Sequence, residues 1–382
     1  MTVDIKEFKA GIYKQQYQYK SFIPSIVNRS WTWSDPKLNT LLEEATHKLG
    51  ELNAFSLYVP DIDIFIRMHV IKEATTSSRI EGTKTKVEEA LQKKVDIPLE
   101  NKDDWQEVHN YVKAMNGAIE QLKQLPLSTR LLKQAHYRLT HRVRGMDKMP
   151  GEYRTSQNWI GGATLKDAVF IPPHHEEVSA QMGDLENFLH NGEIEVPHLV
   201  KIAIAHYQFE TIHPFLDGNG RIGRLMITLY LVDKGLLAKP TLYLSDYFER
   251  NKGLYYDNLT LVRTSDNLTQ WLKFFLVAVI ETSKKGILAF QRILELKEII
   301  EGKKIVTLGR KVGKAKELMN LLYKTPFVSA ADVMQGLKVT APTANGLIRD
   351  FVRLGILNEV TGMKRNRMFK FTEYLRLFSD KN

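Results

Sequence analysis

The stretch from Pro197 to Gly235 contains two apolar segments of helical period separated by a short polar loop. The first segment, PHLVKIAIAHYQFETI, runs directly into His213. The second, NGRIGRLMITLYLVDKG, opens at the glycines and ends near Gly235. Proline and glycine interrupt helices, and Pro214 follows the first segment at once. The pattern therefore predicts two helices joined by a tight loop, HPFLDGNG.

Most of the remaining chain has the same helical period. Further helices are expected in DIDIFIRMHVIKEATTSSRIEG, WQEVHNYVKAMNGAIEQLKQL, STRLLKQAHYRLTHRV and DNLTQWLKFFLVAVIETSKKGILAFQRILELKEIIEG. The segment QNWIGGATLKDAVFIPP differs, because two short apolar pieces flank Gly161 and Gly162. This arrangement predicts a β-hairpin or flap. The sequence as a whole thus predicts a mainly α protein with one short β-hairpin.

The composition is that of an ordinary soluble protein, with 43% hydrophobic residues, 26% charged residues and no cysteine. The lack of cysteine excludes disulfides and thiolate metal sites. The N-terminus MTVDIKEFKAG has no apolar signal core, and the longest apolar run is FFLVAVI. That run is far shorter than the roughly 20 residues that cross a bilayer. We therefore expect a cytoplasmic protein without a membrane partner.

The C-terminal part carries most of the positive charge. The net charge is +10, and residues 301–382 contain sixteen Lys and Arg against seven Asp and Glu. Two short helices are expected in SAADVMQGL and TAPTANGLIRDFVRLG, with Thr340 as N-cap of the second. Two strands follow, with Lys364, Arg365 and Arg367 near their turn. This order resembles a winged helix, a module that binds DNA or serves as a protein-interaction unit, so DNA is a candidate partner.

The loop and the turn that follows it hold several groups suited to phosphate. N–H groups at the start of a helix form an anion nest, and glycines let a phosphate approach closely, here at Gly218 and Gly220. Arg221 and Arg224 are three residues apart, so both lie on one face of the first turns of the helix. Guanidinium groups in this position can grip neighbouring phosphates with charge-assisted hydrogen bonds.

A metal ligand and a base stand beside this nest. Asp217 lies directly before it, and Mg²⁺ commonly takes one or two protein carboxylates together with phosphate oxygens. His213 precedes both, and a neutral imidazole can accept the proton of a hydroxyl near pH 7. The loop therefore indicates phosphate binding, a metal ion and a base for an incoming nucleophile.

Two other nucleotide-binding motifs fit the chain less well. The G-x-G-x-x-G of a dinucleotide fold needs a strand directly before Gly218, where this chain has a helix and then Pro214. The segment GRKVGK is one residue short of a P-loop, and Ala315 stands where a Ser or Thr would bind Mg²⁺.

HPFLDGNGRIGR matches the Fic-family motif, His-Pro-Phe-x-Asp/Glu-Gly-Asn-Gly-Arg-x-x-Arg, at every specified position. GEYRTSQNWIGG together with AVFIPP resembles the segment that carries the flap in this family. LSDYFERNKGLYYDNL is similar to its tyrosine-rich nucleotide-pocket segment, although Lys252 stands where Arg is common. SSRIEG matches the inhibitory-helix motif at Ser77, Glu81 and Gly82. The resemblance covers most of residues 20–285 and implies a Fic helical core.

The resemblance implies transfer of AMP from ATP to a Ser, Thr or Tyr hydroxyl of a target protein. It implies that His213 is the general base and that Asp217 holds Mg²⁺. It also implies that the Asn219 side chain contacts the α-phosphate and that Arg224 holds the γ-phosphate. The residues it implies for ATP are Gly218, Asn219, Gly220, Arg221, Arg224, Tyr243, Tyr247 and Asn251. The flap residues it implies for positioning the target are Trp159, Ile160, Gly161 and Gly162.

The N-terminal motif predicts a way to inhibit this site. Ser77 and Glu81 are four residues apart and share a helix face. Glu81 would pair with Arg224 as a carboxylate–guanidinium fork and occupy the place of the γ-phosphate. Gly82 would leave room beside it. The resemblance therefore implies an autoinhibited enzyme.

We expect three regions: an N-terminal helical region at 1–105 with the inhibitory motif at 77–82, a Fic catalytic core at 106–285 and a winged-helix domain at 300–382. Three functions stay open. The first is an autoinhibited protein adenylyltransferase. The second is an enzyme of the same scaffold that removes AMP or moves phosphate or phosphocholine. The third is a DNA-binding regulator with a vestigial core. Fic proteins often form homodimers, so a second copy is also a candidate partner.

Overall fold

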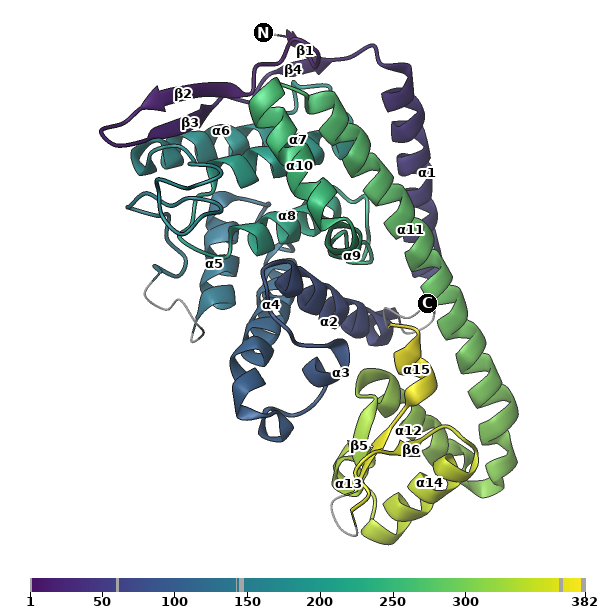
Figure 1. Ribbon diagram of the computed structural model, residues 1–382. Coiled ribbons are helices and arrows are strands. Elements are labelled where there is room, and N and C mark those ends of the chain that lie inside the picture. Colours follow the sequence, from purple (N-terminus) through teal and green to yellow (C-terminus); the bar gives the residue numbers. More distant parts are fainter. Residues whose placement is uncertain (1, 60–61, 142, 144–147, 364–366, 379–382) are drawn as a thin grey trace.

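The computed structural model describes residues 2–59, 62–141, 143, 148–363 and 367–378. It is mainly helical, as the sequence predicts (Figure 1). The principal helices before the C-terminal part are α1 (Pro36–Tyr58), α2 (Ile62–Ile80), α4 (Lys102–Gln121), α5 (Thr129–Thr140), α6 (Val178–His190), α7 (His198–Ile212), α8 (Asn219–Asp233), α9 (Ser245–Arg250), α10 (Lys252–Ser265) and α11 (Leu268–Glu298). A short α3 (Val87–Ala90) follows α2. No helix among the described residues is both long and apolar enough to cross a membrane.

Helices α7 and α8 form the centre of the molecule. Every residue of α7 after His198 is buried, and so are most residues of α8. Such helices lack a polar face because other helices cover them on all sides. The predicted pair of helices around HPFLDGNG is confirmed, and the loop between them starts from a rigid, fully packed support.

The first 32 residues differ from the expected helical region. Strand β1 (Thr2–Asp4) pairs in parallel with β4 (Ser30–Thr32), and β2 (Gly11–Gln15) pairs antiparallel with β3 (Lys20–Pro24). The sequence analysis names no element in these residues, because these strands are too short to show a clear period of two. Tertiary contacts hold them in place. The Phe22 N–H donates at 2.9 Å to the carbonyl of Ile171, the residue that follows the Ile160–Phe170 bridge.

The C-terminal part begins at the end of a long connector. Helix α11 passes without a break through residue 285 and continues as a π-helical segment at Ile299–Lys304 and a 3₁₀ segment at Ile305–Lys311. The expected boundary at 105/106 likewise falls inside α4. Both expected boundaries therefore lie inside continuous helices, so neither marks a break between regions.

The C-terminal elements follow the expected order. They are α12 (Val312–Lys324), β5 (Phe327–Ser329), α13 (Ala330–Leu337), α14 (Ala341–Arg353), β6 (Asn358–Glu359), β7 (Met368–Lys370) and α15 (Thr372–Arg376). The sheet order is β5-β7-β6, with antiparallel pairing. Thr340 precedes α14 at the N-cap position, although its side chain caps no N–H. Lys364 and Arg365 lie outside the described residues.

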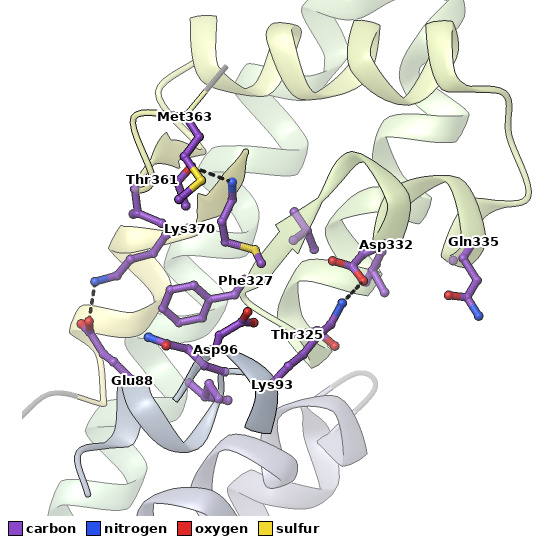
Figure 2. Close-up of a pocket in the computed structure, with 17 residues that line it drawn as sticks. Glu88, Lys93, Asp96, Thr325, Phe327, Asp332, Gln335, Thr361, Met363 and Lys370 are labelled. Carbon is purple, nitrogen blue, oxygen red and sulfur yellow. Dashed lines mark hydrogen bonds and ion pairs between the residues drawn. The ribbon is translucent and has the colours of Figure 1, made fainter. Parts of the chain in front are cut away.

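This C-terminal part packs against the segment that carries the inhibitory motif. The Phe65 ring on α2 lies 5.4 Å from Tyr323 and 6.4 Å from Tyr374, between ring centroids. A pocket of about 900 Å³ lies between the chain after α2 and the C-terminal part. Figure 2 shows ion pairs that bridge its two sides. Lys93 contacts Asp332 at 2.7 Å, and Glu88 contacts Lys370 at 2.7 Å. The C-terminal part therefore holds both α2 and the chain that follows it.

We expect Phe65→Ala to lower the free energy of unfolding by about 3–5 kcal/mol, because the change leaves a cavity between α2 and the C-terminal part, which we call the tail. Urea unfolding followed by circular dichroism measures this. The control Val306→Ala, at a side chain that is 49% exposed, should change the value by less than about 0.5 kcal/mol. Equal midpoints for the two variants would contradict the packing described here.

Candidate active site

The loop between α7 and α8 turns through two left-handed residues. His213 has φ 52° at the C-terminus of α7, and Gly218 has φ 75° before α8. A left-handed histidine is uncommon and needs support from its surroundings. The support comes from the flap segment, because Arg154 Nε and Asn158 Nδ2 donate to the His213 carbonyl at 3.0 and 3.3 Å. The strained backbone conformation therefore lies at the residue that is expected to be the base.

The His213 imidazole is in the state that a base requires. Its Nδ1 lies 3.3 Å from the Glu210 carbonyl oxygen, so Nδ1 carries the proton and Nε2 keeps its lone pair. Burial lowers the pKa of His213 to about 4, with a further lowering from the charge of Arg154. The side chain is therefore neutral at pH 7, with a free acceptor at Nε2.

A second histidine, which sequence reasoning missed, fixes the loop. His136 on α5 accepts the Gly151 N–H at Nδ1 and donates from Nε2 to the Asp217 carbonyl, both at 2.9 Å. Its ring also stacks on Phe215 with 3.8 Å between centroids. Burial lowers the pKa of His136 to about 4, which keeps this arrangement neutral. Nothing in the local sequence around His136 links it to a loop some 80 residues later.

The side chain of Asn219 holds the loop together. Its Oδ1 accepts the Phe215 N–H at 2.8 Å, and its Nδ2 donates to the Phe215 carbonyl at 2.7 Å. Both ends of the amide therefore hold the loop closed, a role that spacing along the chain does not reveal. The contact with an α-phosphate that the resemblance implies stays a prediction.

The first N–H groups of α8 form the expected anion nest. A helix leaves its first N–H groups without carbonyl partners, here at Asn219, Gly220 and Arg221, and its dipole favours an anion at that end. The Arg221 side chain is buried against this turn and donates to Glu107 at 2.9 Å. Arg221 is thus fixed in place before any phosphate arrives.

Asp217 presents one carboxylate at the edge of the nest. Its Oδ1 accepts the Gly218 N–H at 2.6 Å, and its Oδ2 pairs with Lys148 at 2.8 Å. Burial alone would raise the pKa of Asp217, but Lys148 and Arg221 lower it below its usual value. The carboxylate is ionised and partly exposed, which fits a Mg²⁺ ligand that shares the ion with phosphate oxygens.

Two of the three guanidinium nitrogens of Arg224 donate to α2. Its Nε donates to the Ser77 hydroxyl and its Nη2 to the Ser77 carbonyl, both at 2.9 Å. Nη2 also donates to Glu81 Oε1 at 2.6 Å, and the guanidinium is 1% exposed. The predicted pairing of Glu81 with Arg224 is present in the structure. Ser77 adds two contacts that the sequence motif did not specify.

Gly220 lets Glu81 reach the nest. A Cβ atom at Gly220 would lie 2.3 Å from Glu81 Oε1 and 2.9 Å from Arg224 Nη1. The expectation that Gly82 leaves room was wrong, because a Cβ atom at Gly82 would meet nothing within 4 Å. Gly82 instead has φ 107°, which lets the chain turn away at the end of α2. The close approach to Glu81 is therefore at Gly220 on α8 and not at Gly82 after α2.

The end of α2 is held from the segment after α8. Lys252 Nζ donates to the Ile80 carbonyl at 2.6 Å, and Arg79 pairs with Glu249 at 3.4 Å. A cation beside the last carbonyls of a helix also favours the negative end of its dipole. Lys252 therefore anchors the inhibitory motif in this protein.

The three residues expected at the nucleotide pocket separate in the structure. Tyr243 is buried, donates to the Pro240 carbonyl and stacks on His69, in a different cavity. Its contact with a nucleotide stays a prediction. Asn251 donates to the Tyr247 carbonyl at 2.9 Å, which closes a local turn. Tyr256, in the same segment, is 39% exposed, and Lys252 Nζ lies 5.9 Å from the centroid of its ring.

The flap forms as a narrow hairpin. Ile160 and Phe170 pair through three backbone hydrogen bonds, two directly between them and one from the Val169 N–H, at 2.9–3.1 Å. Gly161 and Gly162 follow with φ 70° and 73°, and a Cβ atom at Gly162 would lie 2.4 Å from the Asp167 carbonyl. The expected hairpin is confirmed, and the Trp159 side chain is 39% exposed beside it.

We expect Glu81→Gln to lower the free energy of unfolding by about 1–3 kcal/mol at pH 7, because the buried charge of Arg224 loses its ionic partner. Burial would raise the pKa of Glu81, but Arg224 lowers it below 4.5. The stabilisation is therefore complete above pH 4.5 and is lost as the pH falls through the lowered pKa.

Urea unfolding at pH 7 and at lower pH measures this effect. The control Glu120→Gln removes an exposed pair with Lys123 and should cost less than about 1 kcal/mol. A difference between wild type and Glu81→Gln that stays constant down to pH 3 would show that the ion pair is not its source.

Comparison with known proteins gives a consistent result. Residues 39–120 match the model of the Fic/DOC family N-terminal domain, and residues 126–231 match the Fic/DOC family model. The protein adenylyltransferase Fic of Aedes aegypti is 33% identical over 117 residues, which are 30% of this chain and 21% of that protein. A probable protein adenylyltransferase of Aquifex aeolicus is 40% identical over 89 residues, 23% of this chain and 26% of that protein. The matches thus span about a fifth to a quarter of the length of these relatives.

Solved structures show the same fold. A Fic family protein from Desulfovibrio desulfuricans has a TM-score of 0.57 at 22% identity, over 88% of this chain and 96% of that chain. A Fic domain containing signaling protein from Bacteroides thetaiotaomicron has a TM-score of 0.51 at 18% identity, over 67% of this chain and 97% of that chain. Two adjacent models of the Fic/DOC family match α2, the loop and nearly all of α8, so the chain contains the N-terminal and Fic domains of that family.

Proposed function

We propose that this protein transfers AMP from ATP to a Ser, Thr or Tyr hydroxyl of a target protein. One observation carries the proposal. A neutral imidazole with a free Nε2 lies just before an anion nest, and the buried arginine beside that nest is paired with a carboxylate. A carboxylate in that place mimics a phosphate. The relatives named protein adenylyltransferase support the same activity over the part that they share with this chain.

In the proposed reaction, Nε2 of His213 takes the proton of the target hydroxyl. The hydroxyl oxygen then forms a bond with the α-phosphorus of ATP. The bond from that phosphorus to the oxygen shared with the β-phosphate breaks, and pyrophosphate leaves with the electron pair. The N–H groups of Asn219, Gly220 and Arg221 would stabilise the charge on the phosphates. Asp217 would hold Mg²⁺, which neutralises phosphate charge when it is bound.

The flap supplies a way to hold the target. Ile160 and Phe170 form only one bridge, so the backbone beside them can pair with an extended segment of another protein. The flap is tied to the base, because Asn158 donates to the His213 carbonyl. A target strand added here would bring its hydroxyl to the side of the loop where Nε2 lies.

Glu81 would inhibit the transfer in this scheme. Arg224 would not offer Nε and Nη2 to a γ-phosphate while Ser77 and Glu81 accept from them. The side chain of Glu81 also lies against Gly220, where a phosphate in the nest would approach. ATP bound beside the seated α2 would therefore be misaligned for attack.

The first test labels the protein with ATP radioactive at the α-phosphate, and in parallel at the γ-phosphate, with Mg²⁺. We expect label from the α-position only. Glu81→Gly should raise self-transfer about 5- to 150-fold, the usual range of a coupling between two states. His213→Ala in the Glu81→Gly background should lower it about 10²- to 10⁴-fold, because the base is lost.

The alternatives give different results in the same experiment. Label from the γ-position would make this chain a kinase-like member of the family. No label from either nucleotide, even with cell lysate as a source of targets, would sink the proposal and favour AMP removal or a regulator without transfer. Glu120→Gln is the matched control, because it removes an exposed carboxylate that pairs with Lys123 and not with Arg224.

The pH dependence of transfer gives an independent check. Because the pKa of His213 is lowered to about 4, the base stays neutral from pH 8 down to pH 6. We expect its contribution to the rate to stay level over that range and to fall only as the pH approaches 4. Initial rates of Glu81→Gly between pH 4.5 and 8 measure this. A midpoint at pH 6.5, that of an ordinary histidine, would contradict the buried state of the base.

A further inference from the structure

A second cavity lies behind α2, apart from the nest. Its volume is about 400 Å³, and it lies between α2, α9, α11 and the residues that follow α15. Figure 1 shows α2, α11 and α15 meeting in this part of the molecule. His69, Lys72, Glu73 and Thr76 line it from α2, at spacings that put them on one helix face. That face adjoins the one that carries Ser77 and Glu81.

Buried polar atoms in the wall of this cavity lack partners among the described residues. They are Nε2 of His69, Oε2 of Glu73, Oγ1 of Thr76 and Oγ1 of Thr282. Buried polar groups almost always have a hydrogen-bond partner, so four such atoms around one cavity need an explanation. Each atom is buried, so a ligand in the cavity would meet it once the side chain turns toward the cavity.

The charges around the cavity favour an anion. Three cations share the single carboxylate of Asp246: Lys285 at 2.8 Å, Arg250 at 2.9 Å and Lys72 at 3.5 Å. Lys284 and Arg292 on α11 also line the cavity, and so do the carboxylates of Glu73 and Glu281. Five lining cations therefore stand against three lining carboxylates, which leaves a positive excess.

Apolar groups line the cavity together with these charges. They are the ring of Tyr243, the side chains of Leu288 and Ala289, and the ring of Phe378. Phe378 lies 5.1 Å from His69 between ring centroids, so the residues after α15 close the cavity beside α2. A ligand that matches this lining combines an anionic group with an aromatic or aliphatic one.

We propose that this cavity binds a small amphipathic anion, a phosphate monoester or carboxylate that carries an apolar group, and that its binding strengthens the seating of α2. The regulatory half of this inference rests on the proposed function. The cavity exists in the state in which α2 is seated, and a ligand stabilises the state that binds it. Glu73 links the two sites, because its Oε1 accepts from Tyr111 and Ser245 while its charge interacts with that of Arg224.

The binding test uses phenyl phosphate as the probe and the full chain in a calorimetric titration. Phenol and inorganic phosphate are the parallel arms, because each offers only half of the proposed chemistry. We expect phenyl phosphate to bind more tightly than either. The double variant Arg250→Gln/Lys285→Gln, at partly exposed side chains, should weaken its binding at least about tenfold. The control Lys48→Gln/Lys123→Gln removes two surface cations elsewhere and should leave binding unchanged.

Equal binding of phenyl phosphate to wild type and to Arg250→Gln/Lys285→Gln would overturn the site. Equal binding of phenol or of inorganic phosphate would overturn its proposed amphipathic chemistry. Unfolding curves of both double variants establish that they are folded before titration.

The regulatory test measures AMP self-transfer with and without phenyl phosphate. We expect a several-fold decrease in wild type and no decrease in Glu81→Gly or in Arg250→Gln/Lys285→Gln. Binding at the cavity without any effect on transfer would overturn the coupling to α2. Binding at the cavity in a protein that never transfers label would leave the site intact and defeat the proposed function instead, so the two failures are distinguishable.

Discussion

The pairing of Arg224 with Glu81 is the interaction on which the arrangement of this protein depends. A guanidinium that is almost fully buried needs an ionic partner, and here the partner comes from a helix 143 positions earlier in the chain. This contact fixes where α2 lies on the core. It also fills the place beside the nest at Gly220. One ion pair thus stabilises the fold and occupies the site, so stability and activity are expected to oppose each other.

The rest of the molecule holds α2 in that position from several sides. Lys252 binds its last turn, Phe65 packs into the tail, and the chain after α2 is tied to the tail through Lys93 and Glu88. Helix α11 connects the core to the tail without a break. An event at the tail or in the cavity behind α2 therefore has a direct physical route to Arg224.

The chemistry on the other side of the loop is set by burial. His213 and His136 both have a pKa of about 4, because neither ring is well solvated. The first stays free to accept a proton, while the second has both nitrogens engaged in holding the loop. The same physical effect leaves both histidines neutral, one with a lone pair at Nε2 and the other with both nitrogens bonded to the loop and its support. The difference lies in which neighbours they meet.

Local periodicity and short motifs were enough to predict the helices around the loop, the flap, the nest and the pairing partner of Arg224. They did not predict the strands of residues 2–32, whose pattern is too short, nor the cavity that encloses Tyr243. Tertiary packing makes Asn219 close the loop, brings Glu81 against Gly220 rather than Gly82, and lets His136 support Asp217. These features depend on contacts between residues brought together by packing, and spacing along a chain carries no record of them.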